Sequence, residues 1–397
     1  MKKWKVVASL LTLVILGCLL GGCGGTSGSG GSSSGSSSGG SSSGGSSGST
    51  EPIKIAFVSP LSGDAATYGL AGKRSMELFL EDFNAAGGIK GRKIELLIQD
   101  DTGDPKQAVT AAQKFGDQKD VLALVGSCLS SNTVAMVPVL EKAGLPHLAY
   151  ASSSSKLSGI SPNFYRIAVL DSELGKAMAQ AAATRGAKKV GHLYVNNDYG
   201  KTLGQEVVGE LKKLNVEVVG DYAYLANDRD FQAILTEVKG KQPDIVILSS
   251  TYTDAALITK QARQIGITAP LISHTSVFSS KFLEIAGEAA EGIYLPTCFV
   301  ADNPDPKAQA FAKKFQEKYN MLPDNYNALA YDLIGTITDA LKRAADANEL
   351  TREGVKKALD KSNYTGITGT VKFNSKHDWE RQYLWVTVKG GKFVLSK

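Results

Sequence analysis

The feature that most constrains the fold of this chain is an alternation of short apolar runs with longer helical stretches, which occurs in two series. The first series predicts strands at 53–58, 93–99, 121–125 and 147–149, and helices at 69–85, 105–118 and 132–142. The second series predicts strands at 189–195, 217–224, 245–248 and 270–272, and helices at 173–184, 201–214, 231–239 and 254–265. Strands separated by helices form βαβ units with parallel pairing. We therefore expect an α/β protein with two doubly wound parallel-sheet lobes.

A C-terminal section follows the second series. It predicts a strand at 293–295, helices at 306–319, 326–345 and 352–359, and short strands at 370–373, 383–388 and 393–395. Three helices are too few to enclose a hydrophobic core of their own. We expect this section to pack on the two lobes.

The N-terminus has the pattern of an export signal. Three lysines precede an apolar stretch at 6–20, which is too short for a comfortable transmembrane helix. The stretch ends in Leu20-Gly21-Gly22-Cys23, which resembles the lipobox of bacterial lipoproteins. There, signal peptidase cleaves before a cysteine whose thiol has been diacylated. We expect residues 1–22 to be a lipoprotein signal peptide and Cys23 to carry the lipid. There are two alternatives: Cys18 could be the lipobox cysteine instead, or the segment could be an ordinary secretory signal with an incidental cysteine.

The segment after Cys23 cannot form a folded domain, because residues 24–50 contain only Gly, Ser and Thr. A flexible chain of this length has a root-mean-square span of about 28 Å. We expect residues 23–50 to be a lipid-anchored linker that holds the folded body at the outer face of the cell membrane.

The charge of the folded body excludes one class of partner. The predicted signal peptide contains three of the 44 basic residues, which leaves 41 basic against 39 acidic residues. Nucleic-acid binding requires a concentrated basic face, so a nearly neutral body argues against it. It also argues against electrostatic adhesion to a membrane.

Two cysteines, Cys128 and Cys298, remain in the body. An exported protein can form disulfides, but these two lie far apart in the sequence and in different predicted regions. We expect two free, buried thiols. The cysteines and the four scattered histidines have no metal-ligand spacing, so we expect neither a metal nor a cofactor.

The loops after the predicted strands are the candidate binding site, because ligands of open α/β sheets bind beyond the carboxyl ends of the strands. In the first lobe, the loop at 126–133 leads into a helix, and Ala151 precedes four serines at 152–155. Hydroxyl groups and a helix N-terminus suit a carboxylate. A plain Ser/Asn helix cap and a solvated serine loop are the alternatives.

The second lobe contributes loops at 196–200, 249–254 and 273–276, which contain hydroxyl groups, two tyrosines and a few carboxylates. This composition suits a small zwitterion or polar acid, although a tyrosine in such a loop more often packs than binds. The sequence after residue 50 contains none of the motifs GxSxG, HExxH and GxGxxG. We expect a binding protein and not an enzyme, with a catalytic triad assembled from distant loops as the alternative.

From about residue 53 to the C-terminus, the chain resembles the leucine/isoleucine/valine-binding family of ABC-transporter solute-binding proteins. The residues that carry the resemblance are Pro60-Leu61-Ser62-Gly63 with Tyr68-Gly69, Asn84-Ala85-Ala86-Gly87-Gly88-Ile89, Asp100-Asp101 with Asp104-Pro105, Asn197-Asp198-Tyr199-Gly200, and Ala289-Ala290-Glu291-Gly292. The resemblance implies the type I periplasmic-binding-protein fold, in which two lobes joined by three hinge strands close on an amino acid. Here the hinges would lie near 167–170, 297–300 and 373–375. The N-terminal lobe would be 53–168 plus 300–374, and the C-terminal lobe 169–299 plus 375–397.

The resemblance also assigns ligand contacts. It implies that Ser130 and Ser153 hold the α-carboxylate of the ligand and that the backbone carbonyl of Ala151 accepts from its ammonium group. Tyr68 and Tyr199 match family tyrosines that face the ligand.

The second lobe departs from the family pattern. The acid that pairs with the α-ammonium falls at Thr275, a further family tyrosine falls at Thr251, and the cysteine partner of Cys128 is replaced by Gly103. A buried ammonium group without a counter-charge is costly. Either another carboxylate pairs with the ammonium group, or the ligand has no ammonium group. Asp254, just after Tyr252, is the nearest substitute acid, and a helix-capping role for Asp254 is the alternative.

These observations predict a lipid-anchored solute receptor that delivers a small amino acid, or a related polar carboxylate or amide, to the membrane subunits of an ABC permease. A ligand sensor that signals to a membrane receptor is the first alternative, and a secreted hydrolase is the second. The sequence does not identify the ligand.

Overall fold

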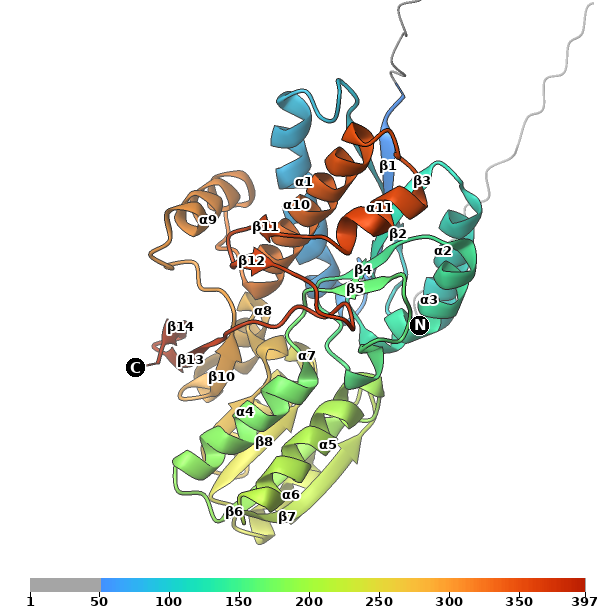
Figure 1. Cartoon of the computed structure of the whole chain (residues 1–397). Helices are drawn as coiled ribbons and strands as arrows, with labels where there is room; N and C mark the ends of the chain where they lie inside the picture. Colours follow the sequence, from blue (N-terminus) through green and yellow to red (C-terminus); the bar gives the residue numbers. More distant parts are fainter. Residues whose placement is uncertain (1–50, 397) are drawn as a thin grey trace, which may run out of the picture. The chain divides into compact units, whose positions relative to one another are not determined.

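The computed structural model describes residues 51–396 and shows two mainly parallel sheets covered by helices (Figure 1). The predicted signal peptide, Cys23 and the linker lie outside the described residues. Within residues 51–396, no helix combines the length and apolarity needed to cross a membrane.

The first sheet has five parallel strands in the order β2-β1-β3-β4-β5. Its strands are β1 (Ile53–Ser59), β2 (Ile94–Asp100), β3 (Val121–Gly126), β4 (His147–Ala149) and β5 (Phe164–Arg166). The helices between them are α1 (Ala66–Ala85), α2 (Pro105–Asp117) and α3 (Ser130–Ala143). Every residue of β3 is buried, as expected for a central parallel strand with helices on both faces.

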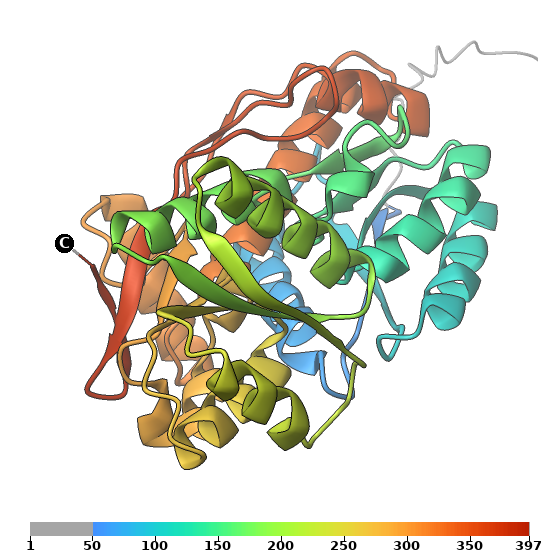
Figure 2. The ribbon, with the colours of Figure 1, turned by 90° about the horizontal axis from the view of Figure 1, so that it is seen from below.

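The second sheet has seven strands in the order β14-β13-β10-β9-β8-β6-β7. They are β6 (Lys189–Val195), β7 (Glu217–Tyr224), β8 (Ile245–Ser249), β9 (Leu271–Ser273), β10 (Tyr294–Thr297), β13 (Leu384–Lys389) and β14 (Lys392–Leu395). Its helices are α4 (Asp171–Thr184), α5 (Asp198–Lys213), α6 (Gln232–Gly240), α7 (Tyr252–Gln264) and α8 (Ser280–Ala286). Helices lie on both faces of this sheet (Figure 2). In this sheet, β13 pairs antiparallel with both β10 and β14, at one edge, and the other strand pairs are parallel.

The C-terminal section is divided between the two sheets. Helix α10 (Asn325–Asp346) packs along α1, and α11 (Arg352–Leu359) packs on α10, while β13 and β14 extend the second sheet. Helix α9 (Pro306–Tyr319) precedes them, and β11 (Tyr364–Thr365) pairs with β12 (Thr370–Val371). This arrangement agrees with the expectation that the section packs on the rest of the chain.

Several helix starts are set by capping side chains. The Asp104 carboxylate accepts from the backbone N–H of Lys106, with Pro105 as the first residue of α2. Asp324 and Asn327 form a reciprocal capping box at the start of α10. These caps end the preceding loops at defined residues.

The prediction of an α/β protein built from parallel sheets is confirmed. The differences lie in short elements: β5, β11 and α8 were not predicted, because a segment of two to seven residues has too little periodicity to be read. Four helices that follow the strand-to-helix loops also begin two or three residues earlier than expected. They are α1, which begins at Ala66, α3 at Ser130, α5 at Asp198 and α7 at Tyr252.

Candidate functional site

A cleft of about 320 Å³ lies where the loops of the first sheet face those of the second. It is lined by first turns of helices and by strand-to-helix loops, at the edge where ligands of α/β sheets bind. From the first sheet and α10 the lining residues are Asp64, Ala65, Tyr68, Thr102, Gly103, Pro105, Cys128, Leu129, Ser130, Ser131, Asn132, Ala151, Ser153 and Tyr326. From the second sheet they are Asn197, Tyr199, Ala226, Asn227, Thr251, Asp254, His274 and Ser276.

One wall of the cleft is rich in hydroxyl groups. Ser130 is the first residue of α3, and its Oγ accepts from the backbone N–H of Ser154 at 3.2 Å. The N-cap residue of α3 is Leu129, which makes no side-chain cap. The first-turn N–H groups of α3 are therefore not occupied by a capping side chain and, with Ser130 and Ser153, can bind an anion.

A fully buried arginine holds the serine loop in place. Arg166 Nη1 donates to the carbonyl of Ser154 at 2.7 Å and to that of Ser152 at 3.3 Å. Its Nε pairs with the buried carboxylate of Asp378 at 2.5 Å. Arg166 thus fixes the loop that presents Ser153, from a strand that the sequence analysis did not predict.

The two predicted tyrosines sit in equivalent places on the two sheets. Tyr68 is in the first turn of α1 and Tyr199 in the first turn of α5, and each is followed by a glycine. A Cβ on Gly69 would lie 1.8 Å from the Pro60 carbonyl oxygen, and one on Gly200 would lie 2.0 Å from that of Val195. Glycine lets each helix start close against the preceding chain, which places the neighbouring tyrosine at the cleft.

The opposite wall contains a buried acid, Asp254, in the first turn of α7. Its Oδ2 accepts from the Thr251 hydroxyl at 2.9 Å, and no backbone N–H of the described chain donates to it. A helix-capping role for Asp254 is therefore not seen. Burial raises the pKa of Asp254 to about 6, and the Thr251 hydroxyl and the Arg229 charge oppose this rise.

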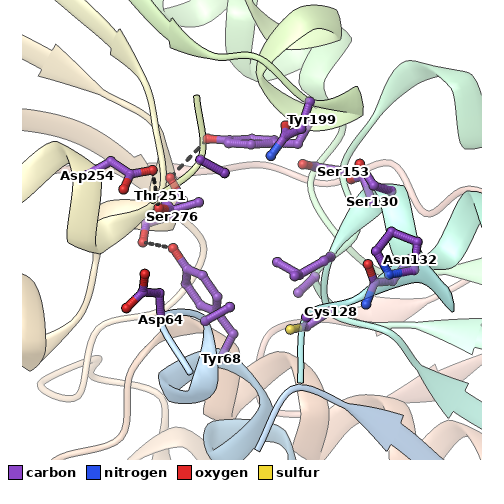
Figure 3. A pocket seen from close by; sticks show the side chains of 18 of the residues that line it. Asp64, Tyr68, Cys128, Ser130, Asn132, Ser153, Tyr199, Thr251, Asp254 and Ser276 are labelled. Atoms are coloured by element: carbon purple, nitrogen blue, oxygen red, sulfur yellow. Dashed lines mark hydrogen bonds between the residues drawn. The ribbon is translucent and has the colours of Figure 1, made fainter. Parts of the chain in front are cut away.

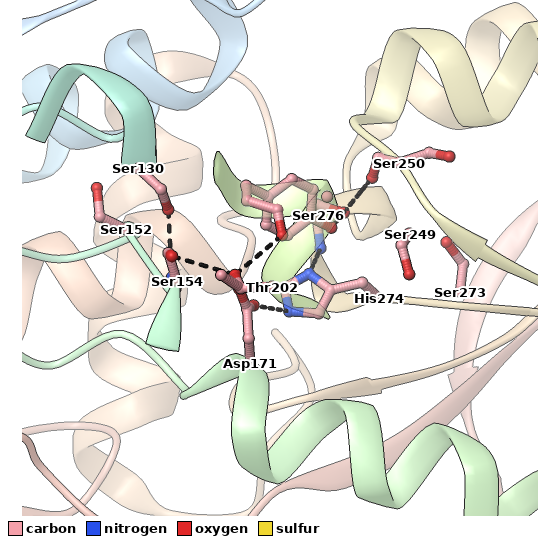
Figure 4. A network of polar contacts seen from close by, with 12 residues as sticks. Ser130, Ser152, Ser154, Asp171, Thr202, Ser249, Ser250, Ser273, His274 and Ser276 are labelled. Atoms are coloured by element: carbon pink, nitrogen blue, oxygen red, sulfur yellow. Dashed lines mark hydrogen bonds and ion pairs between the residues drawn. The ribbon is translucent and has the colours of Figure 1, made fainter. Parts of the chain in front are cut away.

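His274 lines the same wall and contacts a second buried acid (Figure 4). The backbone N–H of Ser276 donates to His274 Nδ1 at 3.1 Å, which assigns the proton to Nε2. Nε2 lies 3.7 Å from Asp171 Oδ1. Burial lowers the pKa of His274 to about 3 and raises that of Asp171 to about 7, so His274 is neutral.

Hydrogen bonds join the two walls across the cleft (Figure 3). The Tyr68 hydroxyl donates to the Ser276 carbonyl at 2.9 Å, and the Tyr252 hydroxyl donates to the Asp64 carbonyl at 2.5 Å. The Arg229 guanidinium pairs with the Asp64 carboxylate, and Lys156 with Asp198 at 2.5 Å. The loops of the two sheets are thus in direct contact around the cleft.

Seven of the nine residues proposed from the sequence line the cleft: Tyr68, Ser130, Ala151, Ser153, Tyr199, Thr251 and Asp254. Tyr252 and Thr275 are buried but do not line it. Tyr252 contacts the Asp64 loop instead, and Thr275 lies between two lining residues, His274 and Ser276.

Other lining residues were not proposed from the sequence. Asn132, His274 and Ser276 lie in the loops that the sequence marked, but their side-chain directions depend on tertiary contacts. Tyr326 comes from α10, where nothing in the sequence distinguishes it from core residues. Cys128 and Cys298 are both free and buried, as expected.

Residues 52–392 match the sequence profile of a family described as periplasmic binding protein. The leucine-, isoleucine-, valine-, threonine- and alanine-binding protein of Pseudomonas aeruginosa is 29% identical over 333 residues, which cover 83% of this chain and 88% of the relative. The Leu/Ile/Val-binding protein of Escherichia coli K12 is 30% identical over 245 residues, which cover 61% of this chain and 66% of the relative.

Solved structures show the same fold. A leucine-binding protein of Thermotoga maritima has a TM-score of 0.81 at 26% identity and covers 87% of this chain and 98% of its own. The branched-chain amino acid transporter substrate-binding protein LivJ of Streptococcus pneumoniae, in complex with isoleucine, has a TM-score of 0.81 at 30% identity and covers 86% and 97%.

Proposed function

The chain belongs to the periplasmic binding protein family, and from this membership we propose that it is a substrate-binding lipoprotein of an ABC importer that clamps a small amino acid, or a related carboxylate or amide. The observation that carries the proposal is the cleft between the two sheets, with Ser130 and Ser153 on one wall and an acid on the other. The relatives whose names specify amino acids support this ligand class.

The hydroxyl-rich wall would bind the carboxylate of the ligand. Ser130 and Ser153 donate their hydroxyl protons, and the first-turn N–H groups of α3 add donors and the positive end of the helix dipole. The carbonyl of Ala151 would accept from a neighbouring ammonium group. Tyr68 and Tyr199 would enclose the ligand from the two sides of the cleft.

Binding would stabilise the closed arrangement of two lobes, 53–168 plus 300–374 and 169–299 plus 375–397. The chain passes between the sheets after β5, after β10 and between β12 and β13, near the three proposed hinges. A ligand that contacts both walls binds the closed state better than the open one, so it shifts the population toward the form that a permease recognises. No covalent step is involved.

The proposed anchor is the lipid on Cys23, with residues 23–50 as the linker. Cys23→Ser should remove lipid labelling and release the protein from the membrane fraction, while Cys18→Ser should leave both unchanged. Retention of the lipid in the Cys23→Ser variant would contradict this assignment.

The binding function is tested by calorimetry of the full-length chain against the amino acids. At least one should bind, and Ser130→Ala should weaken it by tenfold or more, because a lost hydrogen bond to a charged group costs about 1.5–3 kcal/mol. Ser280→Ala, at an exposed position of α8, is the matched control and should leave affinity unchanged. If no small carboxylate or amide binds, or if both variants bind like the wild type, the proposal fails.

A further inference from the structure

The serine loop that presents Ser153 also contacts the second sheet. The loop lies between β4 and β5 and contains a short 3₁₀ helix, Ser155–Leu157. Two of its other side chains, those of Ser154 and Lys156, meet residues of α5. One loop therefore belongs both to the proposed carboxylate site and to the junction of the two sheets.

Ser154 connects a proposed ligand residue to α5. Its backbone N–H donates to Ser130 Oγ at 3.2 Å, and its carbonyl accepts from the buried Arg166 at 2.7 Å. Its hydroxyl accepts from the Thr202 hydroxyl of α5 at 3.1 Å (Figure 4). The same hydroxyl donates to the Asp198 carbonyl at 3.4 Å, and Ser154 is fully buried. The wall that would hold the ligand carboxylate is thus hydrogen-bonded to a helix of the other sheet.

Lys156 adds a charged contact with the same helix. Its Nζ lies 2.5 Å from Asp198 Oδ1, in the first turn of α5. The Asp198 backbone N–H donates to Ser131 Oγ at 3.3 Å, so the start of α5 also contacts the residue next to Ser130. The first turn of α5 is therefore bound by neighbours of both serines proposed to hold the carboxylate.

These contacts would oppose reopening of the proposed clamp. Their donors and acceptors belong to different sheets, so they meet only when the two sheets are closed around the cleft. An arriving ligand meets the open arrangement, in which the contacts are absent, so they have little effect on the association rate. Lys156 and Asp198 are 53% and 28% exposed, so water and salt screen this ion pair.

We propose that Ser154 and Lys156 are positioning residues that latch the loop of Ser153 to the start of α5 and so slow the release of a bound ligand. The latch consists of these two residues and their partners, Asp198 and Thr202. Neither Ser154 nor Lys156 lines the cleft, so both act through Ser153 and not by touching the ligand. The assignment deepens the proposed binding function and rests on it.

Lys156→Met tests the latch in the full-length chain, with the tightest binder found among the amino acids and small carboxylates. The change keeps the length of the side chain and removes its charge at an exposed site. The dissociation rate, measured by stopped-flow fluorescence, should rise about two- to fivefold, as expected for an exposed ion pair, while the association rate stays unchanged. Lys156→Arg keeps the charge and should restore slow release.

Lys281→Met is the matched control. Lys281 and Glu284 also lie 2.5 Å apart and the lysine is 46% exposed, but both belong to α8, so this pair does not join the two sheets. The variant should bind and release like the wild type. Salt gives a second readout: raising NaCl from about 50 to about 500 mM should shrink the difference between Lys156→Met and wild type, because screening weakens the pair.

Ser154→Ala tests the buried part of the latch. The change removes the hydroxyl but keeps the backbone hydrogen bonds to Ser130 and Arg166. It should raise the dissociation rate about three- to tenfold, the size expected for one or two lost hydrogen bonds. Urea unfolding without ligand shows whether this variant folds, and Lys156→Met carries the test if it does not.

The outcomes separate the two proposals. If Lys156→Met and Ser154→Ala release the ligand at the wild-type rate while Ser130→Ala weakens binding, the latch is overturned and the binding function stands. The latch is also overturned if Lys281→Met speeds release as much as Lys156→Met does. If no amino acid, small carboxylate or amide binds, the binding function itself fails, and the latch fails with it.

Discussion

The Tyr68 hydroxyl donates a hydrogen bond to the backbone carbonyl of Ser276 and accepts one from the backbone N–H of Tyr252, both at 2.9 Å. Tyr68 belongs to α1 of the first sheet, whereas Tyr252 is the first residue of α7 and Ser276 lies in the 3₁₀ turn after β9, both on the side of the second sheet. Burial raises the pKa of Tyr68 well above its ordinary value, so the phenol keeps its proton. One neutral side chain therefore satisfies two backbone groups across the cleft.

Tyr68→Phe should weaken ligand binding by about tenfold. The variant keeps the ring but leaves the Ser276 carbonyl and the Tyr252 N–H unpaired in the closed state, and an unsatisfied buried group costs about 1–3 kcal/mol. Calorimetry with a bound ligand measures the change. Tyr222→Phe, on β7 and at a half-buried position that does not line the cleft, is the control. Equal affinity of Tyr68→Phe and wild type would show that the phenol does not stabilise the closed state.

Arg166→Met should destabilise the fold by about 3–5 kcal/mol, because it leaves the buried Asp378 carboxylate without its partner. The change also removes the hydrogen bonds to the Ser152 and Ser154 carbonyls. Urea denaturation measures the loss. Lys54→Met is the control: Lys54 and Asp120 form an exposed ion pair that water screens, so that variant should change the free energy of unfolding far less than Arg166→Met does. Similar losses in both variants would contradict the role given to Arg166.

Asp171→Asn should flatten the pH dependence of stability. Burial raises the pKa of Asp171 from 3.8 to about 7, and the hydroxyls of Ser153 and Thr202 only partly oppose it. Between these values the folded state keeps a proton that the unfolded state has lost. The wild type therefore loses stability as the pH rises from 4 to 7, by at most about 1.4 kcal/mol per pH unit from this group.

Urea unfolding at pH 5, 6, 7 and 8 measures this slope. In Asp171→Asn the contribution is absent, so stability should fall less steeply with pH than in the wild type. Asp244→Asn is the control, because hydrogen bonds from the backbone N–H groups of Lys189 and Lys188 lower the pKa of Asp244, so it does not titrate in this range. Parallel curves for Asp171→Asn and wild type would show that Asp171 is not perturbed as described.

The parts of the fold that the sequence could predict are those set by local pattern. Strand β3 can be predicted from its apolar run, and the start of α2 can be predicted from Asp104-Pro105. Both signals lie within a few neighbouring residues. Ser130 and Tyr68 could be placed at the cleft because each follows a predicted strand. The family resemblance then assigned their roles.

The missed features depend on contacts between distant residues. Strand β5 is defined by pairing with β4, and the Arg166–Asp378 pair joins residues 212 positions apart. In the loop after β9, His274 and Ser276 line the cleft whereas Thr275 between them does not. Which of these side chains point into the cleft is set by a short 3₁₀ helix, Thr275–Val277, and the sequence does not specify that helix.

The glycine that follows Tyr199 gives the last prediction, because α5 contains its own control. A Cβ on Gly200 would lie 2.0 Å from the Val195 carbonyl oxygen, whereas one on Gly209 meets nothing within 4 Å. Gly209→Ala should raise the free energy of unfolding by about 0.5–1 kcal/mol, because alanine is the better helix former. Gly200→Ala should lower it and also weaken ligand binding, since relieving the clash moves the start of α5 and with it Tyr199. Urea unfolding and calorimetry on both variants measure these effects, and a stabilised Gly200→Ala that binds normally would show that the close approach does not position Tyr199.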